Sequence, residues 1–451
     1  MMKTGTPVSR RAFLQAGFSV MGSAALGAGG DQRLRVAFIG LGGRSKSLLK
    51  ECLQYGGSVV ALCDADARQL PEPMGVVSKA GGKAVQVTDY RRLLDGSVGF
   101  DAAVIATPDH WHAPLCRAFM SAGKHVYCEK PLTHSVGEAR ELRGLVKKSG
   151  VVTQLGNQGS ASASLRRSVE LVKAGLLGQV REAHIWVSGF RGADAVDTRM
   201  GEAIPPGFDW DMWLGPAPER PYKAKVYHPG RWRYWWDFGS GTLGDFGCHG
   251  FNLPVRALDL GWPDRIKVDL EAKDGERYMT GVLANLQFPA RGKLNAMTAQ
   301  WYDGDRFPAK ELMNDVVATY GTAPKTGCML VGESGTICAD VWGNGAVLKL
   351  KGDSKFTGVL KHEGAKEVME SLPRTPNHMK EWLEACKGHG KTFSDFETGG
   401  RLTEIVLAGA LAVRVGRDIA WDGEAMRVAD EPRAEAFIHP QCRAKWLVPM
   451  A

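Results

Sequence analysis

The chain has 451 residues, a length that favours more than one domain. Its composition, 44% hydrophobic and 24% charged, excludes a disordered or fibrous protein. The formal net charge of +8 comes without a long block of like charges, which argues against nucleic-acid binding. Nine cysteines without a C-x-x-C pair argue against a zinc ribbon, and their odd number argues against a full disulfide framework.

Residues 1–30 are typical of a twin-arginine export signal. Ser9, Arg10 and Arg11 precede an uncharged, glycine-rich run that ends at Gly30, although Gln15 stands where the pattern often has lysine. The run is too weakly hydrophobic to predict a stable membrane span, and an ordinary basic start before a helix remains the alternative. We expect export of the folded protein to the periplasm.

A strand, a glycine turn and a helix follow the signal. Leu34–Ile39 is rich in β-branched and aromatic residues, and Lys46–Leu53 has a helical pattern. Gly40 and Gly42 are the first two glycines of a G-x-G-x-x-G fingerprint, in which Ser45 replaces the third. Such a turn lets the backbone approach a pyrophosphate at a helix N-terminus, although a tight turn without a ligand has the same pattern.

The next predicted strand, Ser58–Cys63, ends at Asp64. An acidic side chain at this spacing accepts hydrogen bonds from an adenosine ribose and repels a 2′-phosphate, which favours NAD over NADP. Arg68 is the residue that would reverse this preference by reaching a phosphate. A solvated turn carboxylate is the other interpretation of Asp64.

Strands continue to alternate with helices, which predicts a parallel sheet and a nucleotide-binding domain over residues 31–155. The further strands predicted there are Val85–Val87, Phe100–Ala106, His125–Cys128 and Val151–Leu155, with helices at Asp89–Leu94 and Leu115–Ala122. In residues 156–451 we predict strands at Glu182–Phe190, Val282–Phe288 and Leu294–Trp301 and helices at Leu165–Ala174, Thr375–Ala385 and Thr398–Val413.

Two loops at the carboxyl ends of these strands carry polar groups. Lys130 precedes Pro131 and places an ammonium at a strand end, where doubly wound sheets bind ligands. The loop from Thr107 contains His110 and His112, but no third metal ligand is evident, so no metal is predicted.

Four motifs in this order resemble those of the Gfo/Idh/MocA family of oxidoreductases: Gly40-Leu41-Gly42, Cys63-Asp64, Thr107-Pro108 with His112, and Glu129-Lys130-Pro131. The resemblance implies an N-terminal Rossmann dinucleotide-binding domain and a C-terminal α/β domain with a large, open, mostly antiparallel sheet, through which homodimers or homotetramers form. The predicted cofactor contacts are Gly40, Gly42, Gly43, Arg44, Ser45, Asp64, Arg68, Thr107, Pro108, His112, Glu129, Lys130, Asn157 and Gln158. Asn157 and Gln158 are equally reasonable as plain turn residues.

The family also implies an aspartate and a histidine four residues apart, and this chain supplies Asp245 and His249. On a helix these positions share a face. By resemblance, His249 is the acid or base, Lys130 stabilises alkoxide charge and relays protons, and Asp245 orients the substrate or His249. A glycine turn leading into a helix with a structural histidine is the alternative.

The segment 209–238 is rich in tryptophan and proline. Aromatic faces suit pyranose rings, although packing in the core explains them as well. The guanidinium of Arg233 is also suited to bind sugar hydroxyl groups. The predicted substrate contacts are His228, Arg231, Tyr234, Trp235, Trp236 and Asp237.

These observations predict an NAD(H)-dependent oxidoreductase that acts on a sugar or glycoside hydroxyl with tightly bound cofactor. Free NAD(H) is not expected outside the cytoplasm. An alternative is therefore a redox-neutral glycoside hydrolase that works through a transient 3-keto sugar, elimination and water addition. A non-catalytic dinucleotide-binding protein is the second alternative.

Overall fold

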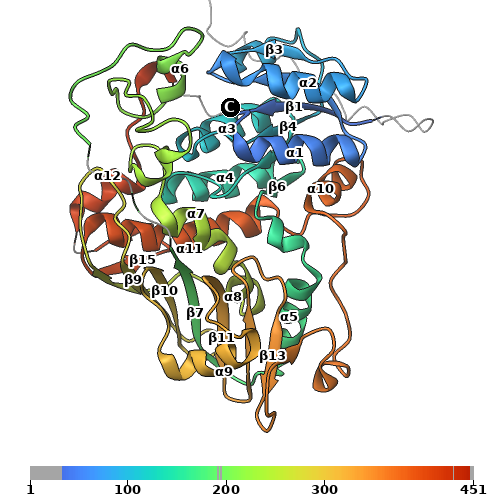
Figure 1. Cartoon of the computed structure of the whole chain (residues 1–451), viewed down its shortest axis with the longest axis vertical. Helices are drawn as coiled ribbons and strands as arrows, with labels where there is room; N and C mark the ends of the chain where they lie inside the picture. The colour runs from blue at the N-terminus through green and yellow to red at the C-terminus, as the bar shows by residue number, and fades with distance from the viewer. Residues whose placement is uncertain (1–32, 190–191, 193–195, 430, 447–451) are drawn as a thin grey trace, which may run out of the picture. The chain divides into compact units, whose positions relative to one another are not determined.

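A six-stranded, wholly parallel sheet forms the N-terminal half of the computed structural model, which describes residues 33–189, 192, 196–429 and 431–446 (Figure 1). The strand order β3-β2-β1-β4-β5-β6 confirms the predicted Rossmann-like arrangement. The predicted export signal lies outside the described residues. The strands are β1 Arg35–Ile39, β2 Ser58–Cys63, β3 Val85–Val87, β4 Ala102–Ile105, β5 His125–Cys128 and β6 Thr153–Leu155.

Successive side chains of each strand point to opposite faces of the sheet, and both faces are apolar. Helices therefore cover both faces. Val36 and Phe38 lie on the face of the sheet that packs against α1, α2 and α10, whereas Ala37 and Ile39 lie on the face that packs against α3 and α4. The helices are α1 Gly43–Gln54, α2 Pro71–Lys79, α3 His112–Ser121, α4 Val136–Ser149 and α10 His378–Cys386. The predicted helix at Asp89–Leu94 is a 3₁₀ turn, Tyr90–Leu93, because the Asp89 carboxylate accepts the Arg91 N–H (2.9 Å) and closes a tight turn.

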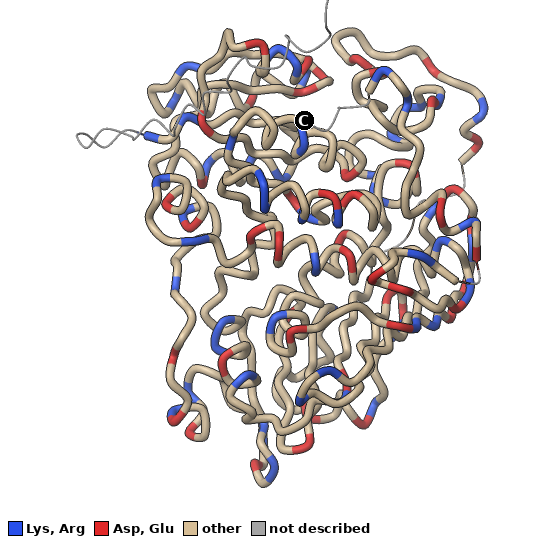
Figure 2. Tube along the Cα trace, turned by 180° about the vertical axis from the view of Figure 1, so that it is seen from behind, with Lys and Arg blue, Asp and Glu red and all other residues tan. Residues whose placement is uncertain are grey.

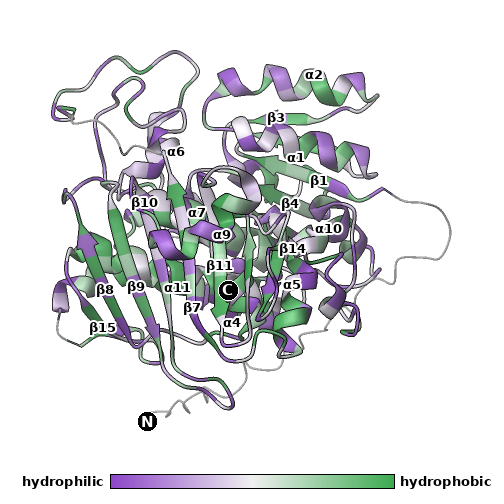
Figure 3. Ribbon diagram, turned by 60° about the horizontal axis from the view of Figure 1, so that its bottom comes forward, coloured by the Kyte–Doolittle hydropathy of each residue, from purple (hydrophilic) through white to green (hydrophobic). Residues whose placement is uncertain are grey.

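A ten-stranded sheet forms the second half, with the order β14-β13-β12-β11-β7-β10-β9-β8-β15-β16. Only β7 and β10 pair in parallel, which confirms the predicted mostly antiparallel sheet. Figure 3 shows hydrophobic residues concentrated on strands of this sheet such as β9 and β11. The strands are β7 Val180–Ser188, β8 Arg265–Leu270, β9 Val282–Phe288, β10 Met297–Gly304, β11 Thr326–Gly332, β12 Gly335–Ala339, β13 Val347–Leu350, β14 Thr357–Gly358, β15 Ile419–Asp422 and β16 Arg427–Val428.

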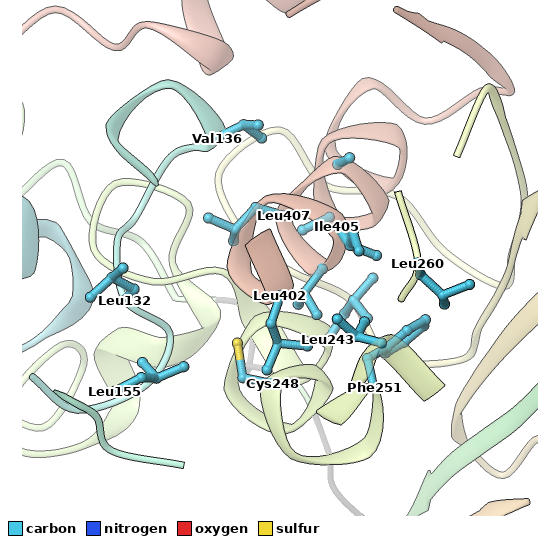
Figure 4. Close-up of a cluster of buried hydrophobic side chains, with 14 of the residues drawn as sticks. Leu132, Val136, Leu155, Leu243, Cys248, Phe251, Leu260, Leu402, Ile405 and Leu407 are labelled. Atoms are coloured by element: carbon cyan, nitrogen blue, oxygen red, sulfur yellow. The ribbon is translucent and has the colours of Figure 1, made fainter. Parts of the chain in front are cut away.

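The largest core extends from one face of the six-stranded sheet to the face of the ten-stranded sheet that α7 and α11 cover. Leu402, Ile405 and Leu407 lie beside Leu243 and Cys248 of the neighbouring helix (Figure 4). This packing fixes the helix that carries Asp245 and His249 against the interior of the protein. The remaining helices are α5 Ala163–Lys173, α6 Trp210–Leu214, α7 Gly241–Gly250, α8 Asn252–Ala257, α9 Lys310–Tyr320, α11 Phe396–Val415 and α12 Glu435–Ile438.

The opposite face of the ten-stranded sheet carries a smaller cluster, in which Trp186 of β7 and Met329 of β11 pack against Met313 and Val316 of α9. Basic and acidic residues are interspersed along the chain (Figure 2). Within the described ranges, no helix combines the length and apolar character required to cross a membrane.

Candidate active site

A cavity of about 680 Å³ opens at the carboxyl ends of β1, β2, β4 and β5 and extends to α7. The structure brings most of the predicted site residues to its wall: Gly40, Gly42, Gly43, Arg44, Asp64, Thr107, Pro108, His112, Glu129, Lys130, Gln158, His228, Asp245 and His249. The other predicted residues do not line it: Ser45, Arg68, Asn157, Arg231, Tyr234, Trp235, Trp236 and Asp237. The predicted catalytic residues thus lie in one cavity with the glycine turn.

The glycines of the turn have different physical roles. Gly40 has a φ of +80°, and a Cβ there would lie 2.7 Å from the main chain of Ala106 and Thr107, at the end of β4. A Cβ at Gly42 or Gly43 would meet no atom within 4 Å. Helix α1 starts at this open space, and no side chain caps its first N–H groups. These donors, together with the space that a Cβ would fill, fit the pyrophosphate of a dinucleotide.

We expect Gly40→Ala and Gly42→Ala to fail in different ways. The first substitution strains the backbone and overlaps β4, and should lower the free energy of unfolding by about 1–3 kcal/mol or more. The second should leave the unfolding free energy within about 1 kcal/mol of wild type but weaken NAD binding, because its methyl group occupies the nucleotide's space. Urea unfolding and calorimetric titration with NAD measure the two effects. Equal NAD affinity for Gly42→Ala and wild type would contradict this division.

Asp64 is held at the rim of the nucleotide space. Its carboxylate accepts the main-chain N–H groups of Leu41 (2.7 Å) and Asp66 (2.9 Å), and burial raises its pKa to about 6. Arg68 donates from Nε and Nη2 to Asp66, at 2.7 and 2.8 Å, so its guanidinium is already engaged by a carboxylate. The Asp64 carboxylate suits the ribose hydroxyls of NAD, and Arg68, which is paired with Asp66, is not free to bind the 2′-phosphate of NADP.

Glu129, in the turn after β5, and His112, at the start of α3, both line the cavity. Glu129 accepts Nε of Arg44 at 2.9 Å and thereby ties this turn to the start of α1. His112 lies between two carbonyl groups, with Nδ1 2.7 Å from the Pro131 oxygen and Nε2 2.9 Å from the Thr107 oxygen. Burial lowers the His112 pKa to about 4, so the ring is neutral and its single N–H donates to one of these two carbonyls.

Lys130 and Asp245 form the centre of the site. Nζ of Lys130 donates to the Asp245 carboxylate and, at 2.8 Å, to its main-chain oxygen. Nε of Arg233 lies 3.3 Å from the other carboxylate oxygen. Burial raises the Asp245 pKa, but the two cations outweigh burial and bring it to about 2. Asp245 is therefore an anion that fixes Lys130 in position.

His249 lies one helical turn after Asp245, on the same face of α7, as predicted. The ring is 5% exposed, and its Nδ1 is buried without a hydrogen-bond partner among the described residues. Burial and the Lys130 charge hold the His249 pKa well below its ordinary value. The ring is neutral at neutral pH and able to accept a proton from a bound hydroxyl.

Asp109 is a site residue that sequence reasoning missed. It lines the same cavity, is 3% exposed and lies near Asp245. Burial and the Asp245 charge hold the Asp109 pKa well above its usual value, although Arg233 and Lys130 act in the other direction. The Thr-Pro-Asp motif was visible in the sequence, but the burial that makes this carboxyl unusual was not.

The raised Asp109 pKa makes stability depend on pH. Above its ordinary value the unfolded chain releases this proton, whereas the folded state keeps it until the higher pKa. Folding then takes up a proton, so stability falls by up to about 1.4 kcal/mol per pH unit across that window. We expect Asp109→Asn to gain unfolding free energy relative to wild type between about pH 5 and about pH 8.

Urea unfolding at both pH values measures this difference. Asp101→Asn is the control: Arg35 lowers the Asp101 pKa although burial raises it, so that carboxyl is ionised throughout this range. Its cost should be the same at both values. Parallel pH curves for wild type and Asp109→Asn would contradict the expectation.

Only part of what was predicted for the tryptophan-rich segment reaches the cavity: His228 and Arg233 line it, whereas Arg231, Tyr234, Trp235, Trp236 and Asp237 do not. Trp235 and Trp236 are buried in the interior, and Asp237 accepts Nε of Arg220 at 2.5 Å. The 3₁₀ turn Arg231–Tyr234 instead presents Trp232 and Arg233 to the cavity, where Trp213 and the distant Trp342 join them. Residue type gave no means of choosing among neighbouring aromatics, because the direction of each side chain depends on the turn.

Two predicted polar contacts are buried away from the cavity wall. Asn157 is fully buried and its side-chain oxygen accepts the hydroxyls of Ser160 (3.1 Å) and Ser394 (2.6 Å). Ser45 is buried within α1. Over the described ranges, no group of His, Cys, Asp and Glu side chains is arranged to hold a metal ion.

Two family models match the chain. One, for the NAD-binding Rossmann fold of an oxidoreductase family designated GFO_IDH_MocA, matches residues 34–157, and one for that family's C-terminal α/β domain matches residues 165–288. Among curated relatives, a glycosyl hydrolase family 109 protein of Shewanella pealeana is 30% identical over 60% of this chain and 54% of its own length. The levoglucosan dehydrogenase of Pseudarthrobacter phenanthrenivorans is 24% identical over 48% of this chain and 49% of its own. The matched region spans about half the length of the first curated relatives.

A solved structure extends the likeness to most of the chain. The WlbA dehydrogenase from Bordetella pertussis, crystallised with NADH and UDP-GlcNAcA, superposes with a TM-score of 0.59. It is 17% identical, and the match covers 86% of this chain and 98% of that one. At this identity the likeness establishes the fold.

Proposed function

This chain belongs to the Gfo/Idh/MocA family of NAD-binding oxidoreductases, and on that premise we propose that it oxidises or reduces a hydroxyl group of a sugar or glycoside, with NAD held tightly. The observation that carries the proposal is the joint placement of Lys130, Asp245 and His249 in the cavity that begins at the glycine turn. Relatives named as a glycosyl hydrolase family 109 protein and a levoglucosan dehydrogenase support a carbohydrate substrate.

The cofactor would lie along the residues that fit it: the turn at Gly40, Gly42 and Gly43 for the pyrophosphate, and Asp64 for the adenosine ribose. When bound, NAD supplies the acceptor or donor of a hydride. Gln158, Thr107 and Pro108 line the same cavity and would contact the bound cofactor there.

The chain's own residues handle the proton and the charge. His249 lines the cavity and is neutral at neutral pH, so it accepts the hydroxyl proton of the bound substrate. The Lys130 ammonium stabilises negative charge that develops on that oxygen. Asp245 holds the ammonium in place, and Trp232, Trp213 and Trp342 offer aromatic faces to a sugar ring.

A second candidate is a redox-neutral glycoside hydrolase that forms a transient 3-keto sugar, eliminates the leaving group, adds water and restores the hydroxyl. The relatives named glycosyl hydrolase family 109 favour it. We propose that the twin-arginine signal directs the folded protein to the periplasm, where a cofactor that remains bound needs no free pool. We further propose assembly as a homodimer or homotetramer through the open sheet, which light scattering of the purified protein tests.

One experiment separates the candidates. The purified protein is denatured, any released nucleotide is identified, and the native protein is assayed on nitrophenyl glycosides without added cofactor. Bound NAD with release of nitrophenol establishes the hydrolase. Bound NAD with stoichiometric NADH formation from a free sugar, but no cleavage, establishes the dehydrogenase. A protein that neither binds NAD nor reacts with any sugar of the panel would overturn the proposal.

A further inference from the structure

A second cavity, of about 540 Å³, lies away from the active site among α5, α8 and the start of α11. The segment 368–372 forms one side of the cavity, and Phe393 also lines it. No residue of this wall also lines the active-site cavity. The proposed function uses none of its side chains.

A buried arginine stands at this wall. Arg256 is 8% exposed, and it donates to the Asn252 side chain (2.7 Å), the Phe393 carbonyl (2.6 Å) and the Ser394 hydroxyl (2.6 Å). All three acceptors are neutral, and each terminal nitrogen retains a second N–H group. Its guanidinium lies 4.0 Å from the centre of the Phe393 ring, which fixes its plane.

A second arginine on the same wall is unengaged. Arg401, one turn into α11, is half-buried and makes no hydrogen bond or ion pair with any described residue. Burying a guanidinium without an ion-pair partner is costly, so two such groups facing one cavity leave a positive potential there. Burial lowers the Arg256 pKa to about 10, although Asp395 nearby partly offsets this.

The acidic side chains that line this cavity already have hydrogen-bond or ion-pair partners. Glu170 accepts the main-chain N–H groups of Ser371 and Leu372, both at 2.8 Å, and Arg374 at 2.8 Å. Asp259 pairs with Lys173 at 3.2 Å, and both of these side chains are largely exposed. The deep part of the cavity therefore remains cationic.

The rest of the wall is mostly apolar. Val169, Val255, Val368 and Leu372 line it, with the Thr398 hydroxyl near Arg401. A cationic end and an apolar side within one cavity match an amphiphilic small molecule rather than a bare ion. We propose that this cavity binds a small organic anion whose carboxylate or phosphate contacts Arg256 and Arg401 and whose apolar body lies on the valine and leucine wall.

Calorimetric titration of the full-length protein tests the proposal. NAD is present at saturation, so that phosphate compounds do not report the active site. The probes are phenyl phosphate and benzoate, which carry the two head groups, and inorganic phosphate, which lacks the apolar body. We expect one of the aromatic anions to bind, at least about tenfold more tightly than inorganic phosphate. The tighter of the two identifies the head group.

Two variants locate the binding. Arg401→Gln removes one cation that no other side chain uses, and Val368→Asp places a negative charge on the wall; each should weaken binding about tenfold or more. Arg35→Gln, on β1 of the other sheet, removes one positive charge elsewhere and should change nothing. Unchanged affinity in both cavity variants, no binding to the NAD-saturated protein, or equal affinity for inorganic phosphate would overturn the proposal. Melting temperatures confirm that each variant is folded.

Discussion

Replacing Lys130 with methionine is expected to reduce turnover of the sugar substrate by about 10²–10³-fold while NAD binding persists. Methionine keeps the length and apolar stem of lysine but removes the ammonium that contacts the Asp245 carboxylate and main-chain oxygen. A developing alkoxide then loses its nearest cation. Because Asp245 keeps Arg233 as a partner, the loss of unfolding free energy should not exceed about 3 kcal/mol.

Single-turnover kinetics with measured nucleotide content separate this effect from loss of cofactor. Lys124→Met is the matched control, because that lysine donates to the Phe100 carbonyl at 2.9 Å at the start of β5, outside the active-site wall. It should retain wild-type turnover. A Lys130→Met enzyme that keeps its NAD and turns over within about tenfold of wild type would show that the ammonium is not used as proposed.

His249→Gln should reduce turnover by about 10²–10⁴-fold. Glutamine is of similar length and forms hydrogen bonds, but it does not take up a proton at working pH. The substitution therefore removes the proton acceptor while the shape of the wall is largely preserved. Substrate affinity should change much less than turnover, because the lost interaction belongs to the transition state.

The pH profile supplies a further readout. Because burial and Lys130 lower the His249 pKa, kcat/KM of the wild type should persist below histidine's ordinary value of 6.5. His184→Gln is the control, since that buried histidine contacts Tyr302 (3.1 Å) and Glu182 (3.0 Å) on strands remote from the active-site wall. If both histidine variants behaved alike, His249 would have no special role in proton transfer.

Gly40 and Gly42 show what the glycine motif predicts and what it leaves undetermined. The fingerprint predicted a tight turn and close approach to a ligand without separating the two. The structure assigns the first to Gly40, which has a positive φ and lies against Ala106, and leaves open space at Gly42. The separation depends on β4, a strand far along the chain from the turn.

Several features followed from the sequence by local rules. Apolar strands that alternate with helices predicted the parallel sheet. Pro131 and the preceding strand placed Lys130 at a strand end, and the i, i+4 spacing put Asp245 and His249 on one helix face. Each of these rules involves residues close together in the chain. The resemblance to a family supplied the roles that such rules do not.

Only the tertiary structure decided which side chains face which cavity. Asp109 has a raised pKa because distant segments bury it beside Asp245, and Trp342 rather than Trp235 or Trp236 meets the active-site cavity. Arg401 has no acidic partner among the described residues because of how segments of α5, α8 and α11 meet around the cavity. Burial, charge environment and side-chain direction arise from packing between segments far apart in the chain, and residue type alone does not encode them.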